Sequence, residues 1–320
     1  MEFIKNKVIP IIDILLAPFT YLSAVLLSVI RKIGVKRMRL SRKIFRTVGV
    51  LPIRDHYYEP LFNPKHLRYS LRKDRILPGI DFNIKEQLEI LSKFKYNEEL
   101  TRFPLDKTNK LEFYYHNGSF GPPDAQYLYN TIRLFKPKKI IEIGSGYSTL
   151  MAENAICANK LEEQNYNCEH ICIEPYSFSW LKNLNVHVMR KRVEEVDIKI
   201  FKELDKSDIL FIDSSHIIRP QGDVLFEYLE ILPILKSGVI VYLHDIFTPK
   251  DYLNEWILDE IKLWNEQYLL EAFLTFNKEY KVIASLNYLK HNYFSEISRV
   301  CPMLIAEPDE EPCSFCIVRK

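Results

Sequence analysis

The chain has 320 residues, of which 47% are hydrophobic and 27% are charged. This composition excludes wholesale disorder, and the length suffices for one large α/β domain with an appendage. The net charge is only +2, and it is unevenly distributed. The first 46 residues hold ten lysines and arginines against Glu2 and Asp13, which leaves 34 basic and 40 acidic residues in the remainder. Because the positive charge gathers at one end, it indicates a local partner and not a nucleic acid.

The amino-terminal segment combines an apolar run with a basic cluster. Residues 8–30 are mainly apolar and long enough to span a bilayer as a helix, although Asp13 and two prolines count against a span. Eight basic residues follow within 31–46, a pattern that attracts an anionic lipid leaflet. No small-residue cleavage site follows the run, so we do not expect a cleaved signal peptide. We expect residues 1–46 to associate with a membrane, and a helix buried on the rest of the protein is the alternative.

The rest of the chain divides into two regions by pattern. Residues 47–110 are polar and rich in proline, which predicts a helical cap or connecting region. Residues 111–320 show short apolar runs that do not alternate and that are separated by helical stretches, as in a parallel sheet covered on both faces. The predicted strands are 140–143, 171–173, 186–189, 209–212 and 239–243, with 281–286 and 314–318 as an antiparallel edge hairpin. The prediction is a Rossmann-like α/β domain with a mainly parallel, seven-stranded sheet.

A glycine turn follows the first predicted strand, in the run KKIIEIGSGYST over 138–149. The strand ends near Glu142, Gly144 and Gly146 allow a tight turn, and a hydroxyl can then cap the next helix. The next strand ends at Glu174, 28 residues after Gly146, where a carboxylate can accept both hydroxyls of a ribose. The two signals together predict a nucleotide-type cofactor. The residues expected to contact it are Glu142, Gly144, Ser145, Gly146, Tyr147, Ser148, Glu174 and Asp213.

A nicotinamide-dependent oxidoreductase is the enzymatic alternative, since its cofactor also binds at a glycine turn. The third glycine that a pyrophosphate requires is replaced here by Thr149. Glu142 would repel a pyrophosphate but would favour a cationic amino-acid group. We therefore prefer a sulfonium cofactor, S-adenosylmethionine, to NAD.

Two pairs of titratable residues follow neighbouring predicted strands. Asp213 and His216 come after one strand, and His244 and Asp245 after the next. The carboxyl ends of parallel strands meet at the ligand-binding edge of the sheet, so we expect all four to converge there. Methyl transfer to oxygen needs an aligned nucleophile and removal of its proton. His216 or His244 is the predicted base, oriented by Asp213 or Asp245.

The runs EIGSGYST, IEP, FIDSSH and YLHDIF together resemble class I methyltransferases, in particular the catechol O-methyltransferase-like and natural-product or polysaccharide-tailoring branch. The resemblance covers roughly 113–320. It implies that Glu142 contacts the methionine amino group and that Glu174 binds the ribose. It also implies that the loop 116–125, with Asn117 and Phe120, lies over the cofactor.

The catechol-type relatives bind Mg²⁺, and the resemblance places the corresponding ligands at Asp213, His244 and Asp245. A histidine is a poor ligand for Mg²⁺, whereas Mn²⁺ or Zn²⁺ would accept the mixed set. A metal is therefore an open possibility.

The cysteines suggest no further site. The six cysteines lack regular spacing, so we expect no disulfide framework and a reducing, cytosolic compartment. Cys313 and Cys316 form a Cys-x-x-Cys pair, but no second close pair completes a zinc site, which favours packing in a strand.

The expected activity is methylation of a hydroxyl on a small molecule, a lipid-linked sugar or a polysaccharide precursor. The basic segment places this activity at the inner face of the cell membrane. A non-catalytic methyltransferase-like scaffold at the membrane is the alternative from a different class.

Overall fold

The computed structural model describes residues 7–320 and separates two compact units, one ending at Tyr69 and the other running from Ser70 to Lys320. Residues 1–6 of the predicted membrane segment lie outside the described residues. The segment 47–110, expected as a cap or connection, is divided between the two units.

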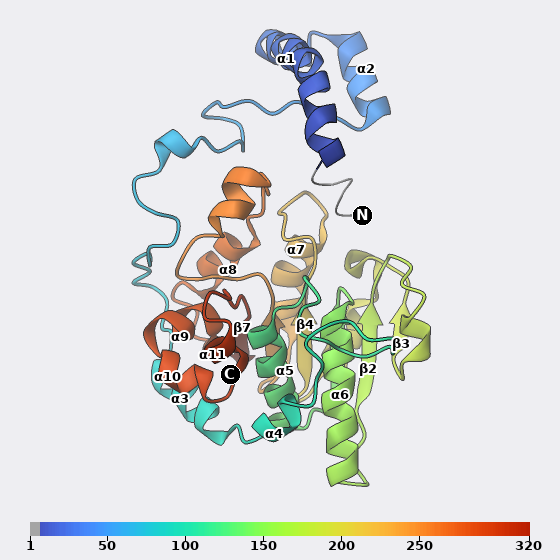
Figure 1. The fold of residues 1–320 in the computed structure, drawn as a ribbon, viewed down its shortest axis with the longest axis vertical. Helices are drawn as coiled ribbons and strands as arrows, with labels where there is room; N and C mark the ends of the chain where they lie inside the picture. Colours follow the sequence, from blue (N-terminus) through green and yellow to red (C-terminus); the bar gives the residue numbers. More distant parts are fainter. Residues whose placement is uncertain (1–6) are drawn as a thin grey trace. The chain divides into compact units, whose positions relative to one another are not determined.

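The amino-terminal unit contains two helices, α1 (Ile9–Ile33) and α2 (Arg39–Val48), shown in blue in Figure 1. Pro10 lies in the first turn of α1, and Gly34 follows its end with a φ of 99°. No residue of α1 is buried, and its length and composition are sufficient to cross a membrane. In α2, Leu40, Ile44 and Val48 are exposed at a spacing of four residues, which gives the helix one apolar stripe among its basic side chains.

The larger unit is built on a seven-stranded sheet in the order β3-β2-β1-β4-β5-β7-β6. The first five strands in the chain are parallel, and β7 runs antiparallel to β5 on one side and to β6 on the other. The strands are β1 (Lys139–Ile143), β2 (Glu169–Ile173), β3 (His187–Met189), β4 (Ile209–Ile212), β5 (Ile240–Leu243), β6 (Tyr280–Ser285) and β7 (Phe315–Arg319). The predicted fold class is confirmed, including the antiparallel carboxy-terminal edge.

Helices cover both faces of this sheet, because alternate residues of the central strands are apolar on both sides. Ile140 and Phe211 point into one core, whereas Ile141 and Ile212 point into the other. The first core is covered by α3 (Ile84–Lys93), α5 (Pro122–Phe135), α6 (Tyr147–Glu162), α9 (Leu286–Asn292), α10 (Phe294–Ser298) and α11 (Met303–Ala306). The second is covered by α7 (Asp223–Phe226), with the turn of π-helix that follows it, and by α8 (Glu266–Leu274).

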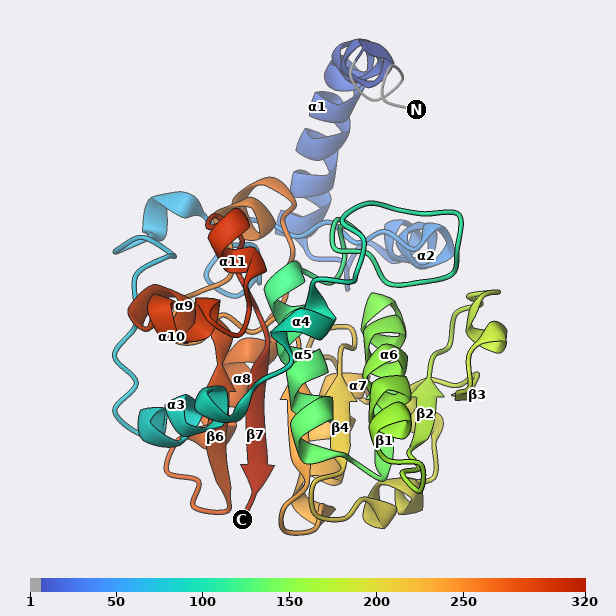
Figure 2. The same ribbon diagram turned by 60° about the horizontal axis from the view of Figure 1, so that its bottom comes forward.

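The placement of two helices positions the site. Figure 2 shows α5 and α6 side by side in front of the sheet, with the short α4 (Asn97–Leu100) nearby. Both helices begin above the carboxyl ends of β1 and β4. At this edge the loops of a parallel sheet bind ligands.

Candidate active site

The glycine turn after β1 contains two glycines in different conformations. Gly144 has a φ of 80°, and a Cβ placed on it would lie 2.0 Å from the carbonyl oxygen of Asp213. Only glycine allows the turn to pass so close to the end of β4. Gly146 has an extended backbone with a φ of −168°, and a Cβ there would meet no atom within 4 Å. Gly146 therefore leaves open space beside the start of α6.

Glu142 is buried beneath the turn and bonds to protein groups on both oxygens. It accepts hydrogen bonds from the Ser148 hydroxyl at 2.6 Å and the Thr149 hydroxyl at 2.7 Å, and its Oε2 lies 3.2 Å from Nε2 of His170. The Thr149 oxygen also accepts the N–H of Gly146 at 3.1 Å. Thr149 stands where dinucleotide-binding motifs have their third glycine. Its hydroxyl accepts the Gly146 N–H, a backbone donor that a phosphate would need. The carboxylate of Glu142 holds the first turn of α6 and does not line the adjacent cavity.

A cavity of about 320 Å³ lies at the carboxyl ends of β1, β2 and β4. Gly144, Glu174 and Asp213 line it. The Glu174 carboxylate accepts the N–H of Ser145 at 3.0 Å and that of Tyr176 at 2.6 Å. A carboxylate has about four lone-pair positions, so two remain for a ligand. Glu174 is therefore held rigidly at the cavity with acceptor capacity to spare.

The loop 116–121 is ordered by Asn117. Its Oδ1 accepts the N–H groups of Ser119 and Phe120, and its Nδ2 donates to the carbonyl of Tyr114. This side chain shapes the loop from within. Tyr147, the first residue of α6, shares a hydrogen bond of 2.8 Å with the Tyr114 hydroxyl and so fastens the same region to the turn.

His216 lies between the two predicted aspartates. Its Nε2 is 3.3 Å from Oδ1 of Asp213 and 3.3 Å from Oδ2 of Asp245, and its Nδ1 is 2.8 Å from Oε2 of the buried Glu266. The Trp264 ring lies against the imidazole, with centroids 4.4 Å apart. Burial by itself lowers the pKa of His216, but Asp213, Glu266 and Asp245 outweigh it and raise the pKa well above its ordinary value.

Two residues of this cluster have strained backbones. His216 and Asp245 both have a φ of 59°, in the left-handed region that non-glycine residues rarely adopt. Such strain persists where the surrounding structure imposes it, and it is concentrated at functional sites. The turns after β4 and β5 are thus bent so that the two side chains face one another.

His244 lies in a second group of donor atoms. Its Nε2 is 3.4 Å from the Cys313 sulfur, and that sulfur is 3.9 Å from Oδ2 of Asp124. Its Nδ1 is 3.6 Å from Asp213 and 3.4 Å from Asp245. Burial lowers the pKa of His244, whereas Asp245, Asp213 and Asp124 together raise it to about 9. His244 therefore lies beside both aspartates of the expected metal set, but its second nitrogen faces a thiol.

Around His216 and His244, the donor atoms form two sets that could hold a metal ion. The donor atoms of Asp213, His216 and Asp245 lie within 4.8 Å of one another, and so do those of Asp124, His244 and Cys313. The first set contains both aspartates of the expected metal site, with His216 in the place given to His244. Cys316 points into the first core instead of joining Cys313.

A second cavity, of about 640 Å³, is lined by other residues of the cluster. His244 and Asp245 line its inner end, and the loop 116–121 and Trp256 line its sides. Asp213 lines the first cavity and Asp245 the second, while His216 lies 3.3 Å from each. The histidine therefore lies between an aspartate of one cavity and an aspartate of the other, and it lines neither cavity itself.

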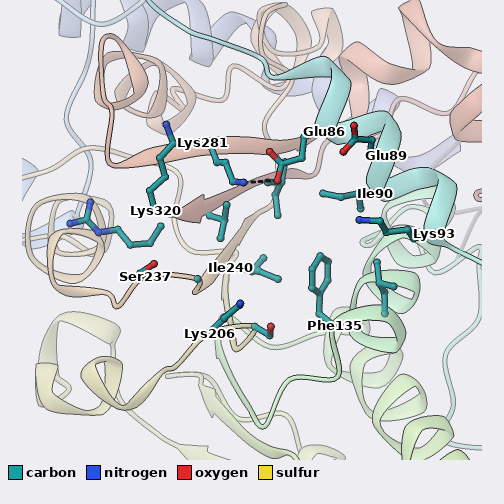
Figure 3. Close-up of a pocket in the computed structure, with 16 residues that line it drawn as sticks. Glu86, Glu89, Ile90, Lys93, Phe135, Lys206, Ser237, Ile240, Lys281 and Lys320 are labelled. Atoms are coloured by element: carbon teal, nitrogen blue, oxygen red, sulfur yellow. Dashed lines mark hydrogen bonds and ion pairs between the residues drawn. The ribbon is translucent and has the colours of Figure 1, made fainter.

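A further pocket, shown in Figure 3, lies at the opposite end of the sheet. Its walls include the start of β5 and the end of β7, and an ion pair between Lys281 and Glu86 crosses one side of it. It contains none of the residues predicted for the site. We therefore place the chemistry at the carboxyl edge of the strands.

Four residues of the site were not predicted from the sequence, namely Asp124, Trp264, Glu266 and Cys313. The sequence predicts the last strand as part of an edge hairpin but not its pairing with β5, and it is that pairing that sets Cys313 beside His244. In the structure Phe315 pairs with Leu243. The other three lie near the starts of helices α5 and α8 and belong to no local pattern.

Comparisons with known proteins find similarity to methyltransferases in this part of the chain. Residues 141–246 match the family described as methyltransferase domain. An uncharacterized protein of Archaeoglobus fulgidus is 29% identical over 201 residues, which cover 59% of this chain and 89% of that protein. Among solved structures, an O-methyltransferase from Bacillus cereus in complex with SAH is similar over 74% of this chain and 91% of its own, at 14% identity and a TM-score of 0.32. The family match spans the glycine turn, Glu174 and both strand-end pairs of this sheet, so residues 141–246 are similar to a methyltransferase domain.

Proposed function

We propose that this protein transfers the methyl group of S-adenosylmethionine to a hydroxyl of a small-molecule or glycan acceptor, with His216 as the base. The observation that carries the proposal is the position of His216, which lies between an aspartate of one cavity and an aspartate of the other. Methyl transfer needs the donor and the acceptor held close together and in line, with a group nearby that removes the acceptor proton.

The cofactor fits the cavity at β1, β2 and β4. Glu174 has free acceptor positions for the two ribose hydroxyls, and the open space beside Gly146 admits the cofactor to the backbone of the turn. Asp213 supplies a negative charge at the wall facing the second cavity, which favours a sulfonium over a pyrophosphate. Glu142, occupied by Ser148 and Thr149, acts by holding the turn in shape.

The transfer is a single displacement. The acceptor oxygen attacks the methyl carbon as the bond from that carbon to sulfur breaks, and the sulfonium becomes a neutral thioether. The hydroxyl proton passes to Nε2 of His216, whose other nitrogen is held by Glu266. Asp213 and Asp245 stabilise the imidazolium that forms, and Trp264 keeps the ring in place.

The acceptor cavity favours a neutral polyhydroxyl compound. Six carboxylates line it, against His116 and His244, so an anionic acceptor would be repelled. These carboxylates belong to Asp124, Asp245, Glu255, Asp309, Glu310 and Glu311. Trp256 and Phe247 add an aromatic wall, with ring centroids 5.3 Å apart. Aromatic faces beside hydrogen-bond acceptors suit the apolar and hydroxyl faces of a sugar.

The amino-terminal unit supports an attachment to the inner face of the cell membrane. In α1 the apolar side chains are exposed along the whole helix, and α2 combines its apolar stripe with four basic residues. A helix with an apolar stripe and basic side chains, such as α2, binds in the interface of an anionic membrane. The two helices together provide an apolar anchor followed by a basic surface helix.

Calorimetric titration tests the cofactor. We expect SAH to bind and NADH not to bind, and tight binding of NADH without binding of SAH would overturn the proposal.

For the base, His216→Gln is expected to lower kcat by about 10²- to 10⁴-fold with SAH affinity retained. His187→Gln, on the exposed β3, is the matched control. Unchanged turnover in His216→Gln would exclude His216 as the base. SAH binding by the unaltered protein without turnover on any acceptor extract would favour the alternative of a non-catalytic scaffold.

A further inference from the structure

The region around the two histidines has an excess of buried negative charge. Asp124, Asp245 and Glu266 are buried and Asp213 is partly exposed. Within the described part of the chain, the ion pairs of these four carboxylates are with His216 and His244 only. Burying a carboxylate costs free energy unless a cation pairs with it. Two protonated imidazoles balance at most half of the negative charge of four carboxylates, so the region is suited to a divalent cation.

Asp124 is oriented as a ligand would be. Its Oδ1 accepts the backbone N–H groups of Cys313 at 3.0 Å and Ser314 at 2.7 Å, which fixes the carboxylate. Among residues 7–320, the hydrogen-bond partner of its Oδ2 is only the Cys313 thiol, at 3.9 Å. One oxygen thus positions the side chain, and the other faces the sulfur at the inner end of the acceptor cavity. This division between a ligating and a supporting contact is typical of metal sites.

The separations between the donor atoms fit tetrahedral zinc. With Zn–S of about 2.3 Å and Zn–N of about 2.0 Å, the sulfur and nitrogen of such a site lie about 3.5 Å apart. The Cys313 sulfur and Nε2 of His244 are 3.4 Å apart, and all three donor atoms fall within 4.8 Å of one another. Nδ1 of His244 has no hydrogen-bond partner among the described residues, and the carboxylates of Asp245 and Asp213 lie 3.4 Å and 3.6 Å from it. A thiolate, an imidazole and a carboxylate select zinc-like ions over Mg²⁺.

We propose that Asp124, His244 and Cys313 form a zinc-type metal site whose fourth position opens into the acceptor cavity. Three protein ligands with one open position are the arrangement of catalytic zinc sites. The ion would take an oxygen of the acceptor as its fourth ligand, a role that rests on the proposed function. Binding of the ion itself does not depend on methyl transfer.

Cobalt substitution of the full-length protein tests the site. After removal of metals with a chelator, Co²⁺ is added and the absorption spectrum is recorded. We expect one Co²⁺ per chain, intense visible bands of tetrahedral cobalt, and a near-ultraviolet charge-transfer band from the thiolate. Cys313→Ser should abolish the near-ultraviolet band and weaken Co²⁺ binding by at least about 100-fold. Cys157→Ser, at an exposed thiol on α6, is the control that should keep the band.

Two further variants separate the two donor sets. Asp124→Asn keeps an oxygen for the backbone N–H groups but loses the charge, so it should fold and should bind Co²⁺ more weakly. His216→Gln should leave the near-ultraviolet band in place. Weak visible bands without a thiolate band, or a band lost in His216→Gln and kept in Cys313→Ser, would overturn the proposal. SAH titrations on the same samples report the cofactor site separately, so SAH binding without the cobalt spectrum would reject the metal site alone.

Discussion

At the scale of single residues, Gly144 and Gly146 have different tasks in one turn. Gly144→Ala would place a methyl group 2.0 Å from the Asp213 carbonyl at a positive φ, so we expect the free energy of unfolding to fall by more than about 2 kcal/mol. Gly146→Ala meets open space and an ordinary backbone, so we expect a change within about 0.5 kcal/mol. Denaturant unfolding measures both.

The same pair separates folding from binding. Because the space beside Gly146 is where we place the cofactor, Gly146→Ala should weaken SAH binding in calorimetry although the protein stays folded. An alanine at 146 that leaves the SAH affinity unchanged would show that the cofactor does not approach this part of the turn.

Glu266 controls the proton affinity of His216. The pKa of His216 is raised by Asp213, Glu266 and Asp245, so neutral base accumulates only as the pH rises, and kcat should increase with pH up to that pKa. Glu266→Gln removes one of these charges and should move the pH profile of kcat about one unit toward acid. Glu230→Gln, at an exposed position, should leave it unchanged. An unshifted profile in Glu266→Gln would exclude His216 as the group that titrates.

The same raised pKa has a consequence for stability. His216 binds its proton more tightly in the folded protein than in the unfolded chain, so its ion pairs stabilise the fold below its ordinary pKa of about 6.5. This contribution is lost as the pH rises through the raised pKa. Melting curves of the metal-free protein should therefore show Tm falling in the alkaline range.

At the scale of elements, α1 and α2 are expected to act as the membrane anchor. Removal of residues 1–48 deletes the exposed apolar surface of α1 and the basic residues of α2, so we expect the protein to move from the membrane fraction to the supernatant. Cell fractionation with immunoblotting measures the distribution. A truncated protein recovered with membranes as fully as the intact one would rule out this segment as the anchor.

At the scale of the whole molecule, the division after Tyr69 predicts that the catalytic unit is complete without the amino-terminal unit. All residues that line the two cavities lie within 70–320. A chain of residues 70–320 should therefore bind SAH within about twofold of the full-length affinity, since no contact to the ligand is removed. Calorimetry on both proteins measures this. A loss of more than about tenfold in a fragment with an unchanged circular dichroism spectrum would contradict it.

The sequence by itself determined the sheet, the glycine turn and the side chains that gather at its edge. Apolar runs buried on both faces are a local property, and so the predicted strand 140–143 differs by only one residue from β1. The convergence of Asp213, His216, His244 and Asp245 followed as well, because parallel strands present their carboxyl ends at one edge.

The tertiary structure alone decided the direction and partners of these side chains. The side chain of Glu142 points under α6 to Ser148 and Thr149, a choice that depends on which face of β1 the helix covers. Glu266 is 50 residues from His216, and Asp124 is 189 residues from Cys313. Such contacts arise from the order of strands and the packing of helices, and no local spacing encodes them. For this reason the pattern of residues identified the edge where chemistry occurs, and only the fold placed His216 between Asp213 and Asp245 and set Nε2 of His244 beside the Cys313 thiol.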